Sequence, residues 1–135
     1  MPPYASSEQL YGAMQLLFDQ LSAQKPGPMD SLAASRLTIR FRLLQPEAEI
    51  TINGRAQPAR MLYGKNHLRP DLQVEMQADL LHRILIREAS IRESFAGGKL
   101  KVLGPIWKTQ VLVDILEAGR TLYPAIVREN GLPLS

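Results

Sequence analysis

The side chains best placed to do chemistry are Asp79 and His82, three residues apart on a predicted helix. Such a pair lies on one helix face and could contribute two ligands to a metal ion or act as an acid–base pair. No third ligand is evident, Arg83 lies beside the pair, and His67 stands alone in a predicted loop. We therefore expect a solvated polar face here, with no metal bound and no catalytic role.

The second candidate is Gly97 and Gly98 followed by Lys99. A phosphate-binding P-loop needs a further glycine upstream and a Ser or Thr after the lysine, between a strand and a helix. Here Glu93 stands upstream and Leu100 follows. The chain has no cysteine and no serine-elbow, dinucleotide-binding or zinc-protease motif. We expect neither enzyme activity nor a cofactor, and the two glycines are expected to end a helix.

The chain has 135 residues, of which 45% are hydrophobic, and a net charge of +3. This is the size of one domain, residues 1–135. The basic residues are scattered among acidic ones, which disfavours nucleic-acid binding but allows transient contact with an anionic membrane surface. The longest apolar run is three residues, and the N-terminus lacks the basic and apolar regions of a signal peptide. We expect a cytoplasmic location.

Periodicity predicts the elements that must position any site. Apolar residues at helical spacing and a capping box at Ser6 and Gln9 predict a first helix over residues 7–23, followed by a link over 29–35. Alternation predicts strands at 37–43, 48–53, 60–63, 72–77 and 99–102, the first two as a hairpin. Helices are predicted at 78–86 and 90–96, and from Pro105 to a stop or kink at Pro124.

This order predicts an α+β fold, with a five-stranded, mostly antiparallel sheet covered on one face by helices. Each strand has one apolar face, which the helices would bury. Trp107 begins the last predicted helix and has two interpretations. It packs into the core, or it lines an apolar cavity together with Phe95, Met76 and Tyr63. Periodicity alone does not separate the two, because a core and a cavity wall use the same residues.

Residues 95–104 resemble the signature segment of the sterol carrier protein domain, Phe-x-x-Gly-Lys-Leu-Lys-x-x-Gly, which precedes that family's last long helix. The matching residues are Phe95, Gly98, Lys99, Leu100, Lys101 and Gly104. The order of elements is similar over residues 10–116, and the chain departs from the pattern at Pro105. The resemblance implies a lipid-binding domain without enzyme activity, in which the sheet and helices enclose an apolar tunnel.

On this basis we expect non-enzymatic binding and transfer of a sterol, fatty acid, fatty acyl-CoA or isoprenoid lipid. The alternative is an interaction or accessory module of the same fold with a filled core, for example a helper of a lipid or quinone biosynthesis complex. Residues 124–135 are expected to form a lid or tail. The residues expected to line the lipid site are Phe41, Ile52, Tyr63, Val74, Met76, Leu81, Leu85, Phe95, Leu100, Trp107, Val111 and Ile115.

Overall fold

The structure is a computed structural model that describes residues 3–130. Its strands are β1 (Thr38–Leu44), β2 (Ala48–Asn53), β3 (Arg60–Tyr63), β4 (Leu72–Gln77) and β5 (Lys101–Leu103). Its helices are α1 (Ser7–Ala23), α2 (Pro28–Ser35), α3 (Ala78–Leu85), α4 (Ile91–Ala96), the 3-10 turn η1 (Ile106–Lys108) and α5 (Thr109–Glu129). The five predicted strands and the bounds of the first helix are thereby confirmed.

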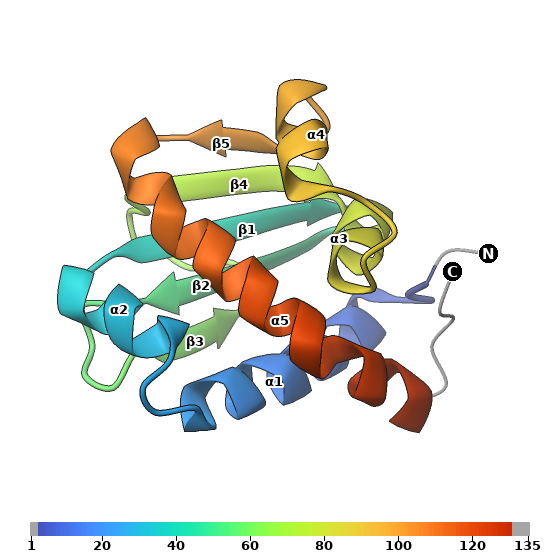
Figure 1. Ribbon diagram of the computed structural model, residues 1–135, viewed down its shortest axis with the longest axis horizontal. Coiled ribbons are helices and arrows are strands. Elements are labelled where there is room, and N and C mark those ends of the chain that lie inside the picture. Colours follow the sequence, from blue (N-terminus) through green and yellow to red (C-terminus); the bar gives the residue numbers. More distant parts are fainter. Residues whose placement is uncertain (1–2, 131–135) are drawn as a thin grey trace.

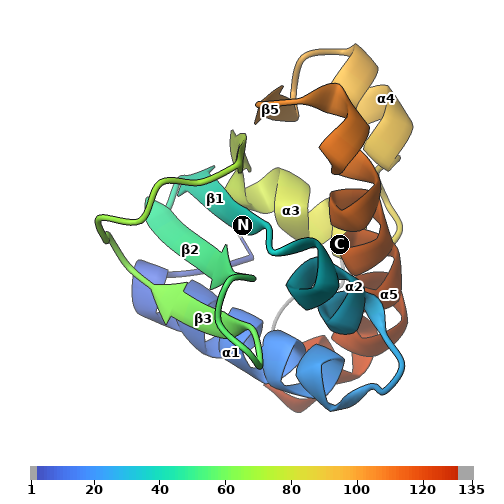
Figure 2. The ribbon, with the colours of Figure 1, turned by 90° about the vertical axis from the view of Figure 1, so that its left-hand side faces the viewer.

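The strands form one sheet in the order β3-β2-β1-β4-β5 (Figure 1). Three neighbouring pairs are antiparallel, and the central pair, β1 with β4, is parallel. The α1, α3 and α5 helices lie on the same face of this sheet (Figure 2). The predicted α+β fold with a mostly antiparallel sheet covered on one face is therefore confirmed.

The alternation in β1 shows why the sheet has two unlike faces. Ile39 and Phe41 are buried under the helices, whereas Arg40 points to the other face. Its guanidinium donates hydrogen bonds to Thr51 Oγ1 at 3.2 Å and to Asn66 Oδ1 at 2.8 Å. The carboxylate of Glu49 lies 3.8 Å away, on the facing strand of the hairpin. The outer face is thus a polar, hydrogen-bonded surface.

Residues 28–35 form helix α2, so the prediction of a link over residues 29–35 was wrong. The segment starts with Pro28, whose missing N–H is not needed in the first turn of a helix. The Asp30 carboxylate accepts a hydrogen bond from the Gly27 N–H at 2.9 Å, which caps the start. Arg36, with φ of 55°, ends the helix in the left-handed region. α1 has already ended at Ala23, and Gly27 and Pro28 therefore begin α2.

The last helix differs from the prediction at both ends. Trp107 lies in the 3-10 turn η1, and α5 begins only at Thr109. A stop or a kink was expected at Pro124, and the stop was wrong, because α5 continues to Glu129. Burial of Ile126 and Val127 outweighs the one backbone hydrogen bond that a proline cannot donate. Of the predicted lid or tail, residues 124–129 belong to α5, and 131–135 lie outside the described residues.

Two glycines of the 95–104 segment have backbone conformations that other residues rarely adopt. Gly98, after α4, has φ of 76°, as expected for a helix terminator. Gly104, after β5, has φ of 129°, and a Cβ there would collide with the backbone oxygen of Asp71. Gly104 therefore requires glycine for steric reasons, and the left-handed backbone at Gly98 favours glycine, whatever the segment does in function.

Candidate lipid-binding site

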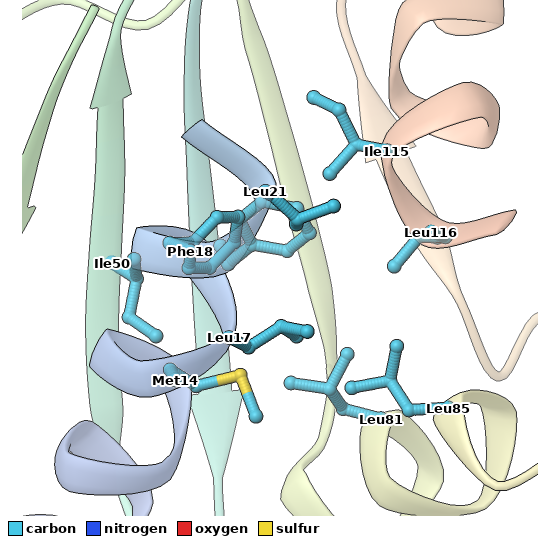
Figure 3. A pocket seen from close by; sticks show the side chains of 10 residues that line it. Met14, Leu17, Phe18, Leu21, Ile50, Leu81, Leu85, Ile115 and Leu116 are labelled. Atoms are coloured by element: carbon cyan, nitrogen blue, oxygen red, sulfur yellow. The ribbon is translucent and has the colours of Figure 1, made fainter. Parts of the chain in front are cut away.

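An apolar seam lies between the sheet and the helices, and we call it the helix–sheet seam. The side chains that line it come from α1, α3, α5, β1 and β2. They are Met14, Leu17, Phe18, Leu21, Phe41, Ile50, Leu81, Leu85, Ile115 and Leu116. Figure 3 shows nine of them converging from the helices and the sheet on one space. All ten are hydrocarbon or thioether side chains, so the wall offers dispersion contacts and no charged group.

One small residue sets how closely α5 approaches the other helices. A Cβ on Gly119 would lie 3.0 Å from Leu85 Cδ2 and 3.7 Å from Leu17 Cδ2. The first of these distances is tighter than ordinary van der Waals contact, so a larger residue would require the Leu85 side chain to shift by a few tenths of an ångström. Arg120, the next residue, donates hydrogen bonds to the backbone oxygens of Ile84 at 2.9 Å and Ala89 at 2.7 Å. These contacts fasten α5 to the end of α3.

The seam is closed in this structure. Its cavity volume is about 10 Å³, which is roughly the space for one water molecule. A drug-sized ligand occupies a pocket of about 300–1,000 Å³. An alkyl chain or a sterol would therefore enter only after the helices separate from the sheet, and the tunnel implied by the resemblance stays a prediction.

Beside the seam, His82 belongs to a buried polar cluster. Its Nδ1 is 2.7 Å from the Tyr123 hydroxyl, which also forms a hydrogen bond with the Tyr4 hydroxyl. His82 is 2% exposed, so the expectation of a solvated histidine was wrong, whereas Asp79 is exposed. Among residues 3–130, no three His, Cys, Asp or Glu side chains lie close enough together to hold a metal ion. The cluster ties the N-terminal segment to α3 and α5.

The buried tyrosines predict how stability depends on pH. Burial, with the Asp19 carboxylate nearby, raises the pKa of Tyr63 to about 12. Burial also raises the pKa values of Tyr4 and Tyr123 above the ordinary value. These hydroxyls stay neutral in the folded protein when they would ionise in the unfolded chain. The part of the stability that depends on their remaining protonated is therefore complete below about pH 10 and is lost as the pH rises through the folded-state pKa values.

We expect the free energy of unfolding to fall progressively above about pH 10. Urea unfolding at a series of alkaline pH values measures this fall. Replacing Tyr123 with phenylalanine removes one of the groups, so the variant should show a shallower dependence on pH. A free energy of unfolding that stays constant up to about pH 12 would contradict the predicted linkage.

The structure places the twelve predicted site residues in three groups. Phe41, Leu81, Leu85 and Ile115 line the helix–sheet seam. Ile52, Val74, Met76 and Leu100 are buried in the core, and Tyr63 and Val111 are half-buried against it. Phe95 and Trp107 are 49% and 82% exposed, so the core interpretation of Trp107 was wrong. Neither side chain lines the seam in this structure, and the cavity interpretation of Trp107 stays a prediction. The 3-10 turn changes the helical rotation before α5, which turns Trp107 away from the stripe that contains Ile115.

Sequence reasoning missed the largest part of the wall. Four residues of α1, one of β2 and one of α5 line the seam but were not among the predicted site residues: Met14, Leu17, Phe18, Leu21, Ile50 and Leu116. The apolar stripe of the first helix was visible in the sequence. That stripe shows which face is buried, but it does not show which other elements the face meets.

A second hollow lies beside the ends of β4 and β5. It has a volume of about 420 Å³, and its lining mixes apolar and charged side chains. The lining residues are Leu44, Glu75, Met76, Gln77, Asp79, Leu80, Arg83, Gly98, Lys99 and Lys101. With two carboxylates and three basic groups in its wall, this hollow is a poor match for an apolar chain. The helix–sheet seam is the better candidate for a lipid.

Solved structures of known proteins have the same fold. Sterol carrier protein domain 2 of Helicoverpa armigera matches with a TM-score of 0.66 and 16% identity, over 86% of this chain and 90% of that one. Sterol carrier protein 2 of Yarrowia lipolytica matches with a TM-score of 0.61 and 18% identity, over 78% and 88%. A UbiJ-SCP2 ubiquinone synthesis protein matches with a TM-score of 0.59 and 18% identity, over 82% and 90%.

The chain therefore has the sterol carrier protein fold, as the 95–104 segment predicted. No family model matches the sequence, and no curated protein matches it. The fold also occurs within a larger enzyme. The sec-alkylsulfatase Pisa1 of Pseudomonas sp. matches with a TM-score of 0.52 and 14% identity, over 67% of this chain but only 14% of that one.

Proposed function

We propose that this protein binds an apolar lipid in the helix–sheet seam and carries it, without enzyme activity of its own. The observation that carries the proposal is the wall of ten apolar side chains between the sheet and three helices. The sterol carrier protein fold of the chain supports the same function. Fatty acids, fatty acyl groups, sterols and isoprenoid lipids all present the hydrocarbon surface that this wall would bury.

The energetics of such a site need no specific polar contact. Each methylene that leaves water contributes about 0.8 kcal/mol. Shortening a bound alkyl chain by about four methylenes should therefore cost ~3 kcal/mol, a loss in affinity on the order of 100-fold. Transfer from a bilayer is nearly neutral, because its interior is equally apolar, and this permits both loading and release. Binding would displace the helices from the sheet, since the seam is closed without a ligand.

One observation favours a second function. The cavity of about 10 Å³ also fits a permanently filled core, in which the domain acts as an accessory module that contacts other proteins. One structure with the same fold is described as a ubiquinone synthesis protein. In this alternative, the seam holds no lipid, and the domain supports a lipid or quinone biosynthesis complex through its surface.

Mass spectrometry of organic extracts from the purified protein separates the two functions. A control protein of similar isoelectric point, purified in the same way from the same cells, measures carry-over. We expect one lipid class to be enriched near one molecule per chain, and added long-chain fatty acid to be taken up in vesicle-free solution. If no lipid is enriched and neither fatty acid nor sterol is taken up, the accessory module is the better description.

A pair of variants on α5 locates the site. Ile115 is buried in the wall of the seam, whereas Val113 is half-buried and outside it. Replacing Ile115 with phenylalanine narrows the space available to a ligand, and we expect fatty-acid affinity to fall about tenfold or more. The same replacement at Val113 should leave the affinity unchanged. Equal affinities in the two variants, both folded by circular dichroism, would place the ligand elsewhere.

A further inference from the structure

Exposed large apolar side chains gather at one end of the molecule. Within residues 3–130, six large hydrophobic residues are exposed, and four of them lie between positions 95 and 107. They are Phe95 at 49%, Leu103 at 57%, Ile106 at 74% and Trp107 at 82% exposure. The elements that carry them, α4, β5 and the turn that leads into α5, follow one another along the top of both Figure 1 and Figure 2. We call these four residues and the basic residues around them the α4–β5 surface.

The net charge of the chain is concentrated in the same segment. Residues 91–108 contain four basic residues, Arg92, Lys99, Lys101 and Lys108, and one acidic residue, Glu93. The segment therefore has a net charge of +3, and the rest of the chain has twelve basic and twelve acidic residues. Three of the basic residues are exposed, and Lys108 is half-exposed. Glu75, Asp79 and Arg83 line the second hollow together with Lys99 and Lys101, and counting them with the segment gives five basic and three acidic residues, so an excess of positive charge remains.

The combination of side chains is typical of a surface that meets a bilayer. A tryptophan, with its apolar rings and polar N–H, is favoured at the boundary between hydrocarbon and headgroups. Lysines near the bilayer keep their ammonium groups among anionic headgroups and lay their stems along the apolar surface. A protein partner would also cover apolar residues, but the excess of positive charge beside them specifies an anionic surface.

We propose that the α4–β5 surface docks the protein on anionic membranes. Phe95, Leu103, Ile106 and Trp107 would enter the interface, and the surrounding lysines would contact acidic headgroups. The surface leads directly into α5, which carries Ile115 and Leu116 in the wall of the seam. Docking thus gives the proposed carrier the contact it needs to load and release lipid, and in this respect it rests on the proposed function. No helix among residues 3–130 is long and apolar enough to span a bilayer.

Trp107 is the only tryptophan of the chain, so its fluorescence reports on this surface alone. Vesicles of equimolar phosphatidylcholine and phosphatidylglycerol should move its emission to shorter wavelength, and brominated lipid should quench it. Vesicles of phosphatidylcholine alone should bind much more weakly, and salt should reverse the binding. Emission that is unchanged with both kinds of vesicle would overturn the proposal.

Matched double variants test whether the exposed apolar residues of the α4–β5 surface bind the vesicles. The double variant Leu103→Ser and Ile106→Ser keeps the tryptophan and should bind anionic vesicles at least about tenfold more weakly. The control is Leu16→Ser with Leu68→Ser, because these are the remaining exposed large hydrophobic residues of the described chain. Binding that is weakened equally in both double variants would overturn the assignment to this surface.

The basic residues are tested in the same way. The triple variant Lys99→Gln, Lys101→Gln and Lys108→Gln should bind on the order of 100-fold more weakly, at about fivefold per charge. The control replaces Lys25, Lys65 and Arg69, which are exposed outside the segment, with glutamine and should bind normally. Equal loss in the two triple variants would mean attraction by net charge alone and would overturn the docking surface.

Two measurements keep this proposal distinct from the proposed function. Fatty-acid uptake in vesicle-free solution should be unchanged in the surface variants, and vesicle binding should be unchanged in Ile115→Phe. Vesicle binding without fatty-acid uptake would support membrane docking by the α4–β5 surface and would reject the proposed carrier function.

Light scattering tests whether a second copy of the chain, instead of a membrane, covers the α4–β5 surface. A dimer in which the tryptophan emission is already at short wavelength without vesicles would show that a second copy covers the surface, and would overturn membrane docking.

Discussion

Replacing Leu17 with alanine is expected to lower the free energy of unfolding by about 2–5 kcal/mol. Leu17 is 2% exposed and lines the helix–sheet seam, and its side chain reaches α5 at Gly119. The seam has a cavity of only about 10 Å³, so every methyl group that is removed leaves new empty space. The loss therefore combines the transfer of the missing groups with the cost of a cavity. Urea unfolding followed by circular dichroism measures it.

The neighbouring Leu16 provides a matched control for this loss. It lies on the same helix and is 41% exposed. The Leu16→Ala variant makes the same chemical change with the same helix propensities, and we expect its free energy of unfolding to stay within about 0.5 kcal/mol of the parent. Similar losses in the two variants would contradict the burial pattern of α1, and would mean that the seam is not packed as the structure shows.

Replacing Tyr123 with phenylalanine is expected to cost about 1–3 kcal/mol of the free energy of unfolding. Its hydroxyl bonds to both the Tyr4 hydroxyl and His82 Nδ1, and all three side chains are buried. The change removes one oxygen and takes a hydrogen-bond partner from each of two buried polar groups. Because such groups are costly to leave without their partners, the effect should exceed that of an exposed hydroxyl. Thermal and urea unfolding both report it.

Tyr63 offers the contrasting case. Its hydroxyl is buried and has no hydrogen-bond partner among the described residues. The Tyr63→Phe variant removes a hydroxyl that forms no hydrogen bond in the folded protein. Its free energy of unfolding should therefore equal or exceed that of the parent protein. If Tyr63→Phe loses as much stability as Tyr123→Phe, the hydrogen bonds of the Tyr123 cluster are not the source of the loss.

The sequence was sufficient for the fold because each strand has one apolar face. In β1, Ile39 and Phe41 alternate with Arg40, and this pattern identifies both the strand and its buried side. The first helix was predictable to the residue, since Ser6 accepts a hydrogen bond from the Gln9 N–H at 3.1 Å and fixes its start. The parallel pairing of β1 with β4 was not specified, because alternation carries no information about strand direction.

The site was predicted less completely, for reasons that particular residues illustrate. The partners of His82 lie in segments far from it in the sequence, and no local pattern shows that Tyr4 and Tyr123 would meet there. Trp107 was assigned to a helical stripe, but the stripe starts only after a turn of different geometry. The width of the seam depends on how closely α5 approaches at Gly119, which is a property of tertiary packing.

The packing of α1 against α5 determines at which stage of synthesis the helix–sheet seam can form. These are the first and last helices of the described chain, and they meet over the seam (Figure 1). A ribosome delivers the N-terminal part first, so α1, α3 and the strands emerge before the segment that completes the wall. A nascent chain that ends before residue 109 lacks α5 and leaves the apolar faces that α5 covers open to water. The helix–sheet seam is therefore assembled only once α5 has left the ribosome.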